Sequence, residues 1–446
     1  MKQIAFIIFG LFMALSIDAA SFDCGKAASK VEKMICDNDE LSHLDEEMSV
    51  VYKTALKDVR NADIIKQAQK KWIKERNEYA EAIHVKQAYQ KQLILLKQPI
   101  VTTPAGKLVF ERNEHTATLL TNGKVLIVGG RDGKYSYLAS AELYDSVSSR
   151  FTVVGKLVTH TRSNHFAVLL PDGKVLIAGG EAPYEGLDPV SPLDSAELYD
   201  PVSATFRETG GFLPFSNVQG GIGLSGSTTA TMLANANVLF ARLFMTGDGS
   251  AEIYDSITRR FIKTGNFIEA RFGHSSTLLT NGNVLFVGGE DNVGMTLTSA
   301  EIYDSKMGTF KQTGGLAQAR YGHTATLMSN GKVLVVGGYF DDFPLSRAEV
   351  YDPVAGRFTD TGPLVKGRTG HTATLLQNGK VLIAGGIGDS GKLSSLELYD
   401  PSTGVFSLIG RFVDANQSHI PVLLKNGNVL FIGNSTVELF VLAMIQ

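Results

Sequence analysis

The chain has 446 residues, and its 42 Lys and Arg nearly balance its 45 Asp and Glu, giving a formal net charge of -3. This balance excludes a strongly basic nucleic-acid-binding protein, which needs a concentrated cationic surface. No glycine lies between Gly25 and Gly106, and no proline precedes Pro99. Because glycine and proline punctuate turns, we expect a helical part up to about residue 98 and a turn-rich part from residue 99 onward.

The first residues have the pattern of an export signal. After Met1-Lys2-Gln3, an apolar run extends from Ile4 to Ile17. As a helix this run spans only ~21 Å, which is too short for a ~30 Å hydrocarbon core. We therefore expect residues 1–20 to be a cleaved signal peptide, with an uncleaved anchor as the alternative. The protein would then be periplasmic or secreted, with no membrane span left after cleavage. Because oxidising compartments preserve disulfides, we predict a bond between Cys24 and Cys36, the two cysteines of the chain.

Residues 21–98 show helical periodicity. Ser29 and Glu32 have the spacing of a capping box, which predicts the start of a short helix. Two apolar stripes with helical spacing predict two or three antiparallel helices. The first stripe comprises Leu41, Leu44, Met48, Val51, Tyr52, Ala55 and Val59, and the second comprises Ile65, Ala68, Trp72, Tyr79 and Ile83, with Tyr89, Leu93 and Leu96 as its continuation.

Charge is segregated within this helical part. An acidic set precedes a basic set: Asp37, Asp39, Glu40, Asp45, Glu46 and Glu47, then Lys66, Lys70, Lys71, Lys74 and Arg76. The simpler interpretation is two solvated helix faces that attract each other. The alternative is an acidic surface that binds a basic partner.

Residues 22–80 also carry an ordered set of short motifs. These are Cys24, Glu32-Lys33-Met34-Ile35-Cys36, Asp39-Glu40-Leu41, Leu44-Asp45, Tyr52, Gln69-Lys70-Lys71-Trp72 and Arg76-Asn77. In this order the segment resembles the LprI-type lysozyme-inhibitor N-terminal domain family, small helical modules of exported bacterial proteins. The resemblance implies binding to a lysozyme-like hydrolase. The family commonly has a further cysteine just after the Arg-Asn pair, where this chain has Glu78-Tyr79-Ala80, so only one disulfide is possible here.

The rest of the chain consists of seven copies of one repeat, with a period of about 51 residues. Each copy contains a His-Thr-Ala-Thr-Leu-Leu type strand, an Asn-Gly or Asp-Gly hairpin signal, and a Val-Leu-Ile type strand ending at a glycine pair. A Glu-Leu-Tyr-Asp type strand and a strand that begins at Phe follow. Four antiparallel strands in each of seven copies predict a seven-bladed β-propeller over residues 99–446. The last copy lacks a fourth strand, so we expect residues 100–108 to complete it and close the ring.

The Val-Gly-Gly turns and the Tyr-Asp spacing make this repeat resemble the kelch family. The third copy departs from the pattern, because Arg242-Leu243 replaces the glycine pair and Ala236 replaces the hairpin glycine. We therefore expect a distorted third blade. Kelch propellers include the galactose oxidase family, which has a copper site and a tyrosine–cysteine crosslink. No cysteine occurs in residues 37–446, so that crosslink cannot form here.

Two repeated positions carry ionisable groups. A His stands once in nearly every copy, which favours packing over a metal site: His115, His165, His274, His323, His371 and His419. An Arg three residues before the His and the Glu of the third strand predict a repeated blade-to-blade ion pair. The residues are Arg112, Arg162, Arg271, Arg320 and Arg368, with Glu142, Glu197, Glu301, Glu349 and Glu397. The alternative for the arginines is a cationic ring that binds anions. We predict no metal, cofactor or catalytic residue.

Strand alternation places the long, variable loops on one face: residues 131–139, 181–195, 207–227, 290–298, 339–347 and 387–395. Binding residues concentrate on such loops. The candidates are Tyr135, Tyr137, Tyr184, Phe212, Phe215, Tyr339, Asp341, Asp342 and Phe343. The alternative is that several of them only pack the loops.

Together these patterns predict an exported, monomeric, non-enzymatic binding protein. The propeller would recognise a protein or a glycan, and the helical module would bind or inhibit a lysozyme-like hydrolase. The alternative is a carbohydrate-active or carbohydrate-binding propeller with its site in the long loops. In a third interpretation the module is only a folding or tethering appendage.

Overall fold

The computed structural model describes residues 21–22, 24–57, 62–97, 100–184, 187–213, 228–243, 249–413 and 419–442. The chain forms two compact units, Met1–Pro99 and Ile100–Gln446. The predicted signal peptide, Val59 and the candidate Phe215 lie outside the described residues. Within the described part of the chain, no helix has both the length and the apolar character needed to cross a membrane.

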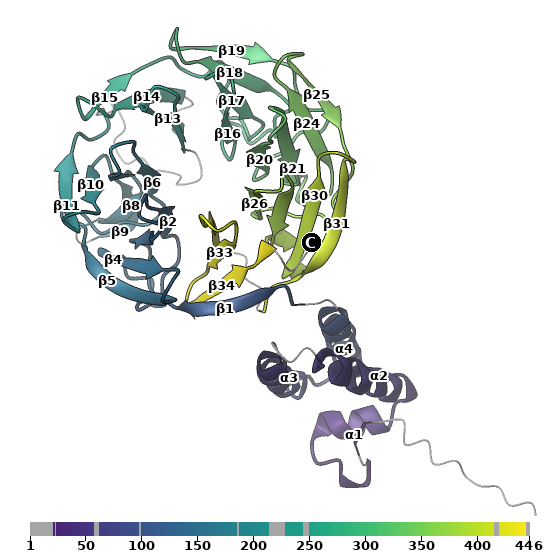
Figure 1. Ribbon diagram of the computed structural model, residues 1–446. Coiled ribbons are helices and arrows are strands. Elements are labelled where there is room, and N and C mark those ends of the chain that lie inside the picture. Colours follow the sequence, from purple (N-terminus) through teal and green to yellow (C-terminus); the bar gives the residue numbers. More distant parts are fainter. Residues whose placement is uncertain are drawn as a thin grey trace, which may run out of the picture. The chain divides into compact units, whose positions relative to one another are not determined.

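The first unit is helical (Figure 1). Its elements are the 3-10 helix η1 (Cys24–Lys26) and the α-helices α1 (Lys30–Cys36), α2 (Asp39–Ala55), α3 (Ala62–Arg76) and α4 (Ala82–Lys97). The second predicted stripe therefore divides between two helices. Tyr79 lies between α3 and α4, and Ile83 lies in the first turn of α4. They are 42% and 52% exposed, so the prediction that they belong to the core is wrong.

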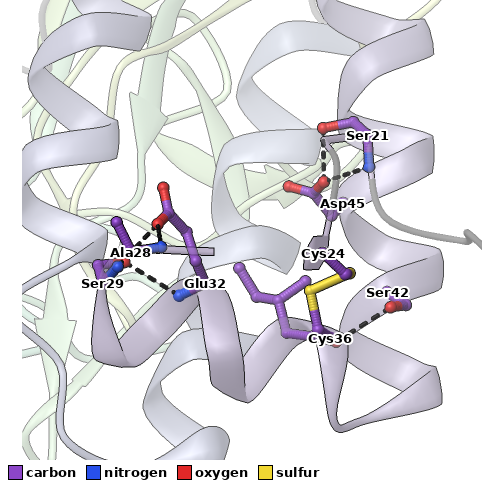
Figure 2. Close-up of a disulfide and its surroundings, with 9 residues drawn as sticks. Ser21, Cys24, Ala28, Ser29, Glu32, Cys36, Ser42 and Asp45 are labelled. Atoms are coloured by element: carbon purple, nitrogen blue, oxygen red, sulfur yellow. Dashed lines mark hydrogen bonds between the residues drawn. A yellow bond between two sulfur atoms is a disulfide. The ribbon is translucent and has the colours of Figure 1, made fainter. Parts of the chain in front are cut away.

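The start of the helical unit is held by short-range contacts (Figure 2). The predicted capping box is confirmed, because Ser29 Oγ accepts a hydrogen bond from Glu32 N at 3.1 Å and Glu32 Oε2 accepts one from Ser29 N at 2.8 Å. The predicted disulfide between Cys24 and Cys36 is present and ties η1 to the end of α1. Ser42 Oγ donates to the carbonyl oxygen of Ile35 at 3.0 Å, which fixes α1 against α2.

A buried polar network joins three of the helices. The Asp45 carboxylate accepts a hydrogen bond from the Tyr89 hydroxyl, which in turn accepts one from Arg76 Nη1 at 2.6 Å. Trp72 lies edge-on to the Tyr89 ring at 5.1 Å. Asp45, Trp72 and Arg76 all belong to the motifs that carry the family resemblance. In this structure they hold the helices together, because a buried charge needs its partner to be stable.

The exposed acidic side chains of α2 pair with α4 rather than with the basic set of α3. Glu40 Oε1 lies 2.6 Å from Lys86 Nζ, and Glu47 Oε1 lies 2.7 Å from Lys97 Nζ. Within α3, Lys66 contacts Asp63 on the same helix. The predicted attraction between the acidic and basic sets is thus confirmed for the buried Asp45, whose Oδ1 lies 3.6 Å from Arg76 Nη1, but not for the exposed Glu40 and Glu47.

The second unit is a closed ring of four-stranded antiparallel sheets, which confirms the predicted seven-bladed propeller (Figure 1). Blades 1 to 3 comprise β2 (Thr116–Leu119), β3 (Val125–Val128), β4 (Ser140–Asp145) and β5 (Arg150–Lys156); β6 (Phe166–Leu169), β7 (Val175–Ala178), β10 (Ala196–Asp200) and β11 (Thr205–Thr209); and β12 (Thr229–Met232), β13 (Val238–Leu243), β14 (Gly249–Asp255) and β15 (Arg260–Lys263).

Blades 4 to 7 complete the ring. They comprise β16 (Ser275–Leu278), β17 (Val284–Val287), β18 (Ala300–Asp304) and β19 (Thr309–Thr313); β20 (Thr324–Leu327), β21 (Val333–Val336), β24 (Ala348–Asp352) and β25 (Arg357–Asp360); β26 (Thr372–Leu375), β27 (Val381–Ala384), β30 (Ser395–Asp400) and β31 (Val405–Arg411); and β32 (Ile420–Leu423), β33 (Val429–Ile432), β34 (Thr436–Phe440) and β1 (Thr102–Lys107).

Blade 7 contains both ends of the propeller sequence. Strand β1 pairs antiparallel with β34, Thr102 opposite Phe440, and so supplies the missing outer strand. The predicted closure is thus confirmed. The first strand of each blade contacts the first strands of both neighbours around the centre of the ring. Closure leaves only outer strands as free sheet edges.

The second strand of each blade supplies the core. Alternate side chains of a strand point to opposite faces, so Val125 and Ile127 pack against blade 7, whereas Leu126 and Val128 pack against blade 2. All four side chains are at most 1% exposed. This two-sided burial explains why these strands are continuously apolar in the sequence.

The third blade is regular, which corrects the expected distortion. Its strands pair without a register shift, and β13 extends through Arg242 and Leu243, which pair with Ser250 and Gly249. Ala236 takes the left-handed conformation of the hairpin glycines, with φ 73° against 83° at Gly123. Without a glycine pair to end it, the second strand simply continues.

Candidate functional site

In blades 1, 2, 4, 5 and 6 the loop after the second strand forms a short hairpin on one face of the propeller, here called the loop face. Three are paired strands: β8 (Glu181–Tyr184) with β9 (Leu187–Pro192), β22 (Tyr339–Phe340) with β23 (Phe343–Pro344), and β28 (Ile387–Gly388) with β29 (Gly391–Lys392). In blades 1 and 4, single bridges join Arg131 to Tyr137 and Glu290 to Thr296. Each of these hairpins begins with a residue that is bridged to the segment leading into the first strand of the same blade, as Arg131 is to Asn113.

The repeated Arg and Glu side chains lie within ion-pair distance in five blades. The Nη2–Oε1 distances are 2.5 Å for Arg112–Glu142, 3.3 Å for Arg162–Glu197, 2.6 Å for Arg271–Glu301, 2.8 Å for Arg320–Glu349 and 2.5 Å for Arg368–Glu397. Both members of each pair belong to one repeat, so the pair lies within a blade and not between blades as expected. All five arginines are 0% exposed, which excludes a cationic ring that contacts anions.

Each pair attaches the incoming connection to its blade. In blade 1, Glu142 accepts hydrogen bonds from the amides of Val109 and Phe110 at 2.7 and 3.1 Å. Arg112 Nη1 donates to the carbonyl oxygen of Gly129 at 2.8 Å. Burial lowers the pKa of Arg112, and the charge of Glu142 opposes this shift. The geometry is that of a structural pair, because each buried charge is paired and hydrogen-bonded.

Blade 3 supplies its guanidinium from a different position. Arg242, which replaces the first glycine of the pair, places Nη1 3.4 Å from Glu252 Oε1 and Nη2 3.3 Å from Asp194 Oδ1. Its guanidinium also lies 4.1 Å from the centre of the Phe212 ring. Burial lowers the pKa of Arg242 and raises that of Glu252. Arg242, which breaks the sequence pattern, therefore supplies the positive charge that balances the buried carboxylate of Glu252.

The repeated histidines join neighbouring first strands. His165 Nε2 lies 2.8 Å from Thr116 Oγ1 of the preceding blade, and the same contact recurs at His274, His323, His371 and His419. Burial lowers the pKa of His115 and His371 to about 3 and that of His274 to about 4. The rings are thus neutral near pH 7 and serve as hydrogen-bonding groups. Among the described residues, no group of three or more His, Cys, Asp or Glu could hold a metal ion.

The candidate binding residues do not all lie at the surface. Tyr135 and Phe343 are 78% and 69% exposed, whereas Phe212 is 6% exposed and packs against Phe240 and Phe261. Phe212 therefore belongs to the core and is not available to a partner. Tyr184 lies in β8, opposite Leu187.

Four candidates lie on one hairpin of blade 5. Asp341 and Asp342 form its turn in the left-handed conformation, with φ 48° and 62°, between Tyr339 and the exposed Phe343. The Tyr339 ring stacks on Tyr321 at 5.8 Å. Burial raises the pKa of the Glu290 carboxyl, and the charges of Asp291 and Asp342 add to the effect. We call Glu290, Asp291, Tyr321, Tyr339, Asp342 and Phe343 the blade 4–5 patch.

Sequence reasoning missed a second group, on blades 1 and 2. The residue before the repeated His or its equivalent is left-handed in five blades: Glu114, Asn164, Gly273, Gly322 and Gly370 have φ between 51° and 63°. At a non-glycine residue this conformation costs about 1 kcal/mol. The sequence signal was available, because two polar residues stand where three copies have glycine.

The side chains of Glu114 and Asn164 enter a network centred on Arg131. Glu114 Oε2 lies 3.0 Å from Arg131 Nε, and Asn164 Nδ2 donates to Glu181 Oε1 at 3.0 Å. Arg131 Nη2 also donates to Glu181, and its guanidinium lies 4.4 Å from the centre of the Tyr137 ring. We call Glu114, Arg131, Tyr137, Ser163, Asn164 and Glu181 the blade 1–2 cluster.

Comparison with known proteins agrees with this architecture. Residues 115–157 and 319–364 match the family model of the Kelch motif. A novel fungal alcohol oxidase with catalytic diversity among the AA5 family, solved in complex with copper, is 15% identical over 76% of each chain, with a TM-score of 0.60. The structure of YjhT is 13% identical over 68% of this chain and 98% of its own, with a TM-score of 0.50.

At these identities the solved structures establish the fold alone. No curated protein matches the chain. The resemblance of residues 22–80 to LprI-type domains stays a prediction. Taken together, the blade geometry and the comparisons identify residues 100–446 as a seven-bladed β-propeller in which residues 115–157 and 319–364 match the Kelch motif.

Proposed function

We propose that this is an exported binding protein whose propeller recognises a protein or a glycan through its loop face. The observation that carries the proposal is the blade 4–5 patch. It combines an exposed Phe343, a stacked tyrosine pair and three carboxylates in the connecting segments of blades 4 and 5. Exposed aromatic and charged side chains on loops over a rigid scaffold are typical of recognition surfaces.

The test compares the two faces of the propeller in the full chain. Partners are captured from cell-envelope extract and from immobilised glycans, and each captured partner is then titrated to obtain its Kd. We expect Tyr339→Ala and Phe343→Ala to weaken binding by about tenfold or more, as truncation of aromatic anchors does. The control is Val202→Ala, because Val202 is 95% exposed in the turn between β10 and β11 on the opposite face. Equal Kd values for all variants would contradict the proposal.

For the helical unit we propose binding to a lysozyme-like hydrolase. The support is the family resemblance together with the exposed carboxylates of Asp39 and Glu46, which suit a basic partner. The full chain in excess should slow lysozyme, and a Glu46→Lys variant should slow it less. Unchanged lysozyme activity in the presence of the native chain would contradict this part of the proposal.

The competing function is a carbohydrate-active enzyme with catalytic carboxylates in the loops. The fungal alcohol oxidase shows that this fold can carry an active site. Turnover of a glycan that binds the loop face, abolished by Glu114→Gln or Glu181→Gln, would favour the enzyme. Binding without turnover would favour recognition.

A further inference from the structure

The blade 1–2 cluster breaks the repeat in a way that the fold does not require. The left-handed residues of neighbouring blades are joined through their backbones: Gly322 N donates to Gly273 O at 3.1 Å, and Gly370 N to Gly322 O at 3.3 Å. Asn164 N donates to Glu114 O at 3.0 Å in the same way. Glycine therefore makes this contact equally well. Glu114 adopts a backbone conformation that is unfavourable for its side chain, Asn164 adopts one that Asn tolerates at a smaller cost, and neither residue improves the contact.

What the two polar residues add is a network of side chains. Glu114 reaches Arg131 of its own blade, and Asn164 reaches Glu181 of its own blade. The Arg131–Glu181 ion pair then joins the two blades. The equivalents of Arg131 and Glu181 in blades 4, 5 and 6 are Glu290, Tyr339 and Ile387, which follow the glycine pair directly. Among these five blades, only blades 1 and 2 place an opposite-charge pair here.

The cluster is buried on one side and open on the other. Ser163 is 0% exposed and Glu181 is 7% exposed, whereas the side chains of Arg131 and Glu114 keep 20% and 39% of their surface. Burial raises the pKa of Tyr137, and the charge of Glu181 adds to this shift. Fixed polar groups with an accessible edge are typical of a pre-formed ligand site.

We infer that the blade 1–2 cluster binds a carbohydrate, a ligand rich in neighbouring hydroxyl groups. This inference rests on the proposal that the loop face is the recognition surface. Two carboxylates against one guanidinium repel an anion, and a cation would have to compete with Arg131 for both of them. A hydroxyl both donates and accepts, so a diol can bond to a carboxylate and to the guanidinium or the Asn164 amide without breaking the ion pairs.

A neighbouring aromatic residue fits the same ligand. Tyr135 lies in the hairpin that begins at Arg131, is 78% exposed and is left-handed at φ 64°. Its ring offers an apolar surface to the face of a sugar, while the cluster holds the hydroxyl groups. The site thus combines an apolar ring of blade 1 with the polar groups that join blades 1 and 2.

The experiment restores the repeat's own residue. The full chain is titrated onto immobilised glucan, mannan, galactan and chitin oligosaccharides to obtain a Kd for each. The Kd values of a Glu114→Gly/Asn164→Gly variant are compared with those of the native chain. We expect the variant to bind at least about tenfold more weakly, since charged hydrogen bonds are lost. Its melting temperature should be equal or higher, because glycine relieves the left-handed conformation. The control is Asp389→Gly, which removes an exposed carboxylate from the blade 6 hairpin and should leave the Kd unchanged.

Each other outcome overturns the inference and separates it from the proposed function. A lower melting temperature of the glycine variant would mean that the cluster is structural. Unchanged glycan affinity in that variant, with affinity lost in Tyr339→Ala, would refute this site and leave the loop face as the binding surface. No binding to any of the oligosaccharides, or capture of a protein that depends on Glu114 and Asn164, would refute the carbohydrate class.

Discussion

The buried histidines predict that the propeller loses stability in mild acid. Burial holds the pKa of His115 and His371 near 3 and that of His274 near 4 in the folded state, whereas a histidine in the unfolded chain has its ordinary value of about 6.5. Above that value neither state binds the proton, and folding carries no cost. As the pH falls below it, the unfolded chain is protonated first and unfolding becomes easier.

The size of the effect follows from the linkage. At pH 5.5, one unit below the unfolded value, each such histidine costs about 1.4 kcal/mol, and the three together cost about 4 kcal/mol. Burial also lowers the pKa of His165 and His323 well below the ordinary value, so they add to the loss. The loss should continue down to the folded pKa values and then level off for these groups.

Urea unfolding at pH 7.5 and 5.5 measures the loss, followed by the near-ultraviolet circular dichroism of the tyrosines. The fluorescence of Trp72, the single tryptophan, follows the helical unit separately. In a His115→Gln variant the difference between the two pH values should shrink by about 1.4 kcal/mol, whatever its stability at pH 7.5. His160→Gln, at an exposed position, should keep the native difference. Equal differences in the native chain and in His115→Gln would refute the reasoning.

Three further predictions concern stability. Ala236→Gly should stabilise the propeller by up to about 1 kcal/mol, because Ala236 is left-handed at φ 73°, and Gly282→Ala should destabilise it by a similar amount, because Gly282 is left-handed at φ 86°. The two variants should shift the melting temperature in opposite directions. Arg242→Leu should lower the free energy of unfolding in urea by about 3–5 kcal/mol, because it leaves the Glu252 carboxylate buried without its guanidinium partner. The exposed Arg207→Leu should lower it by less than about 0.5 kcal/mol, and similar losses for the two variants would contradict the charge-balancing role of Arg242. Replacing Cys24 and Cys36 by Ser should lower the stability of the helical unit by about 3 kcal/mol through loop entropy, seen in Trp72 fluorescence, and leave the propeller transition unchanged; an unshifted Trp72 transition would refute it.

The propeller could be predicted from sequence because its information is local and repeated. Hairpin glycines such as Gly123 set each turn, and the alternation of Val125 to Val128 makes each second strand bury both faces. Seven copies with one strand missing at the end then dictate closure through β1. The same logic located the buried Arg and Glu positions, since a charge repeated in every blade is a packing feature.

The tertiary structure decided the features that depend on departures from the repeat. Arg242 was expected to distort blade 3, yet the fold brings it to Glu252 and Asp194, a contact that only the neighbouring strand and blade create. The contacts of Glu114 with Arg131 and of Asn164 with Glu181 became visible only in the structure, where blades 1 and 2 place Arg131 beside Glu181. Local patterns specify strands, turns and their number because these obey short-range sterics and periodicity. The pairing of individual side chains across blades is set by packing distances that no sequence spacing encodes.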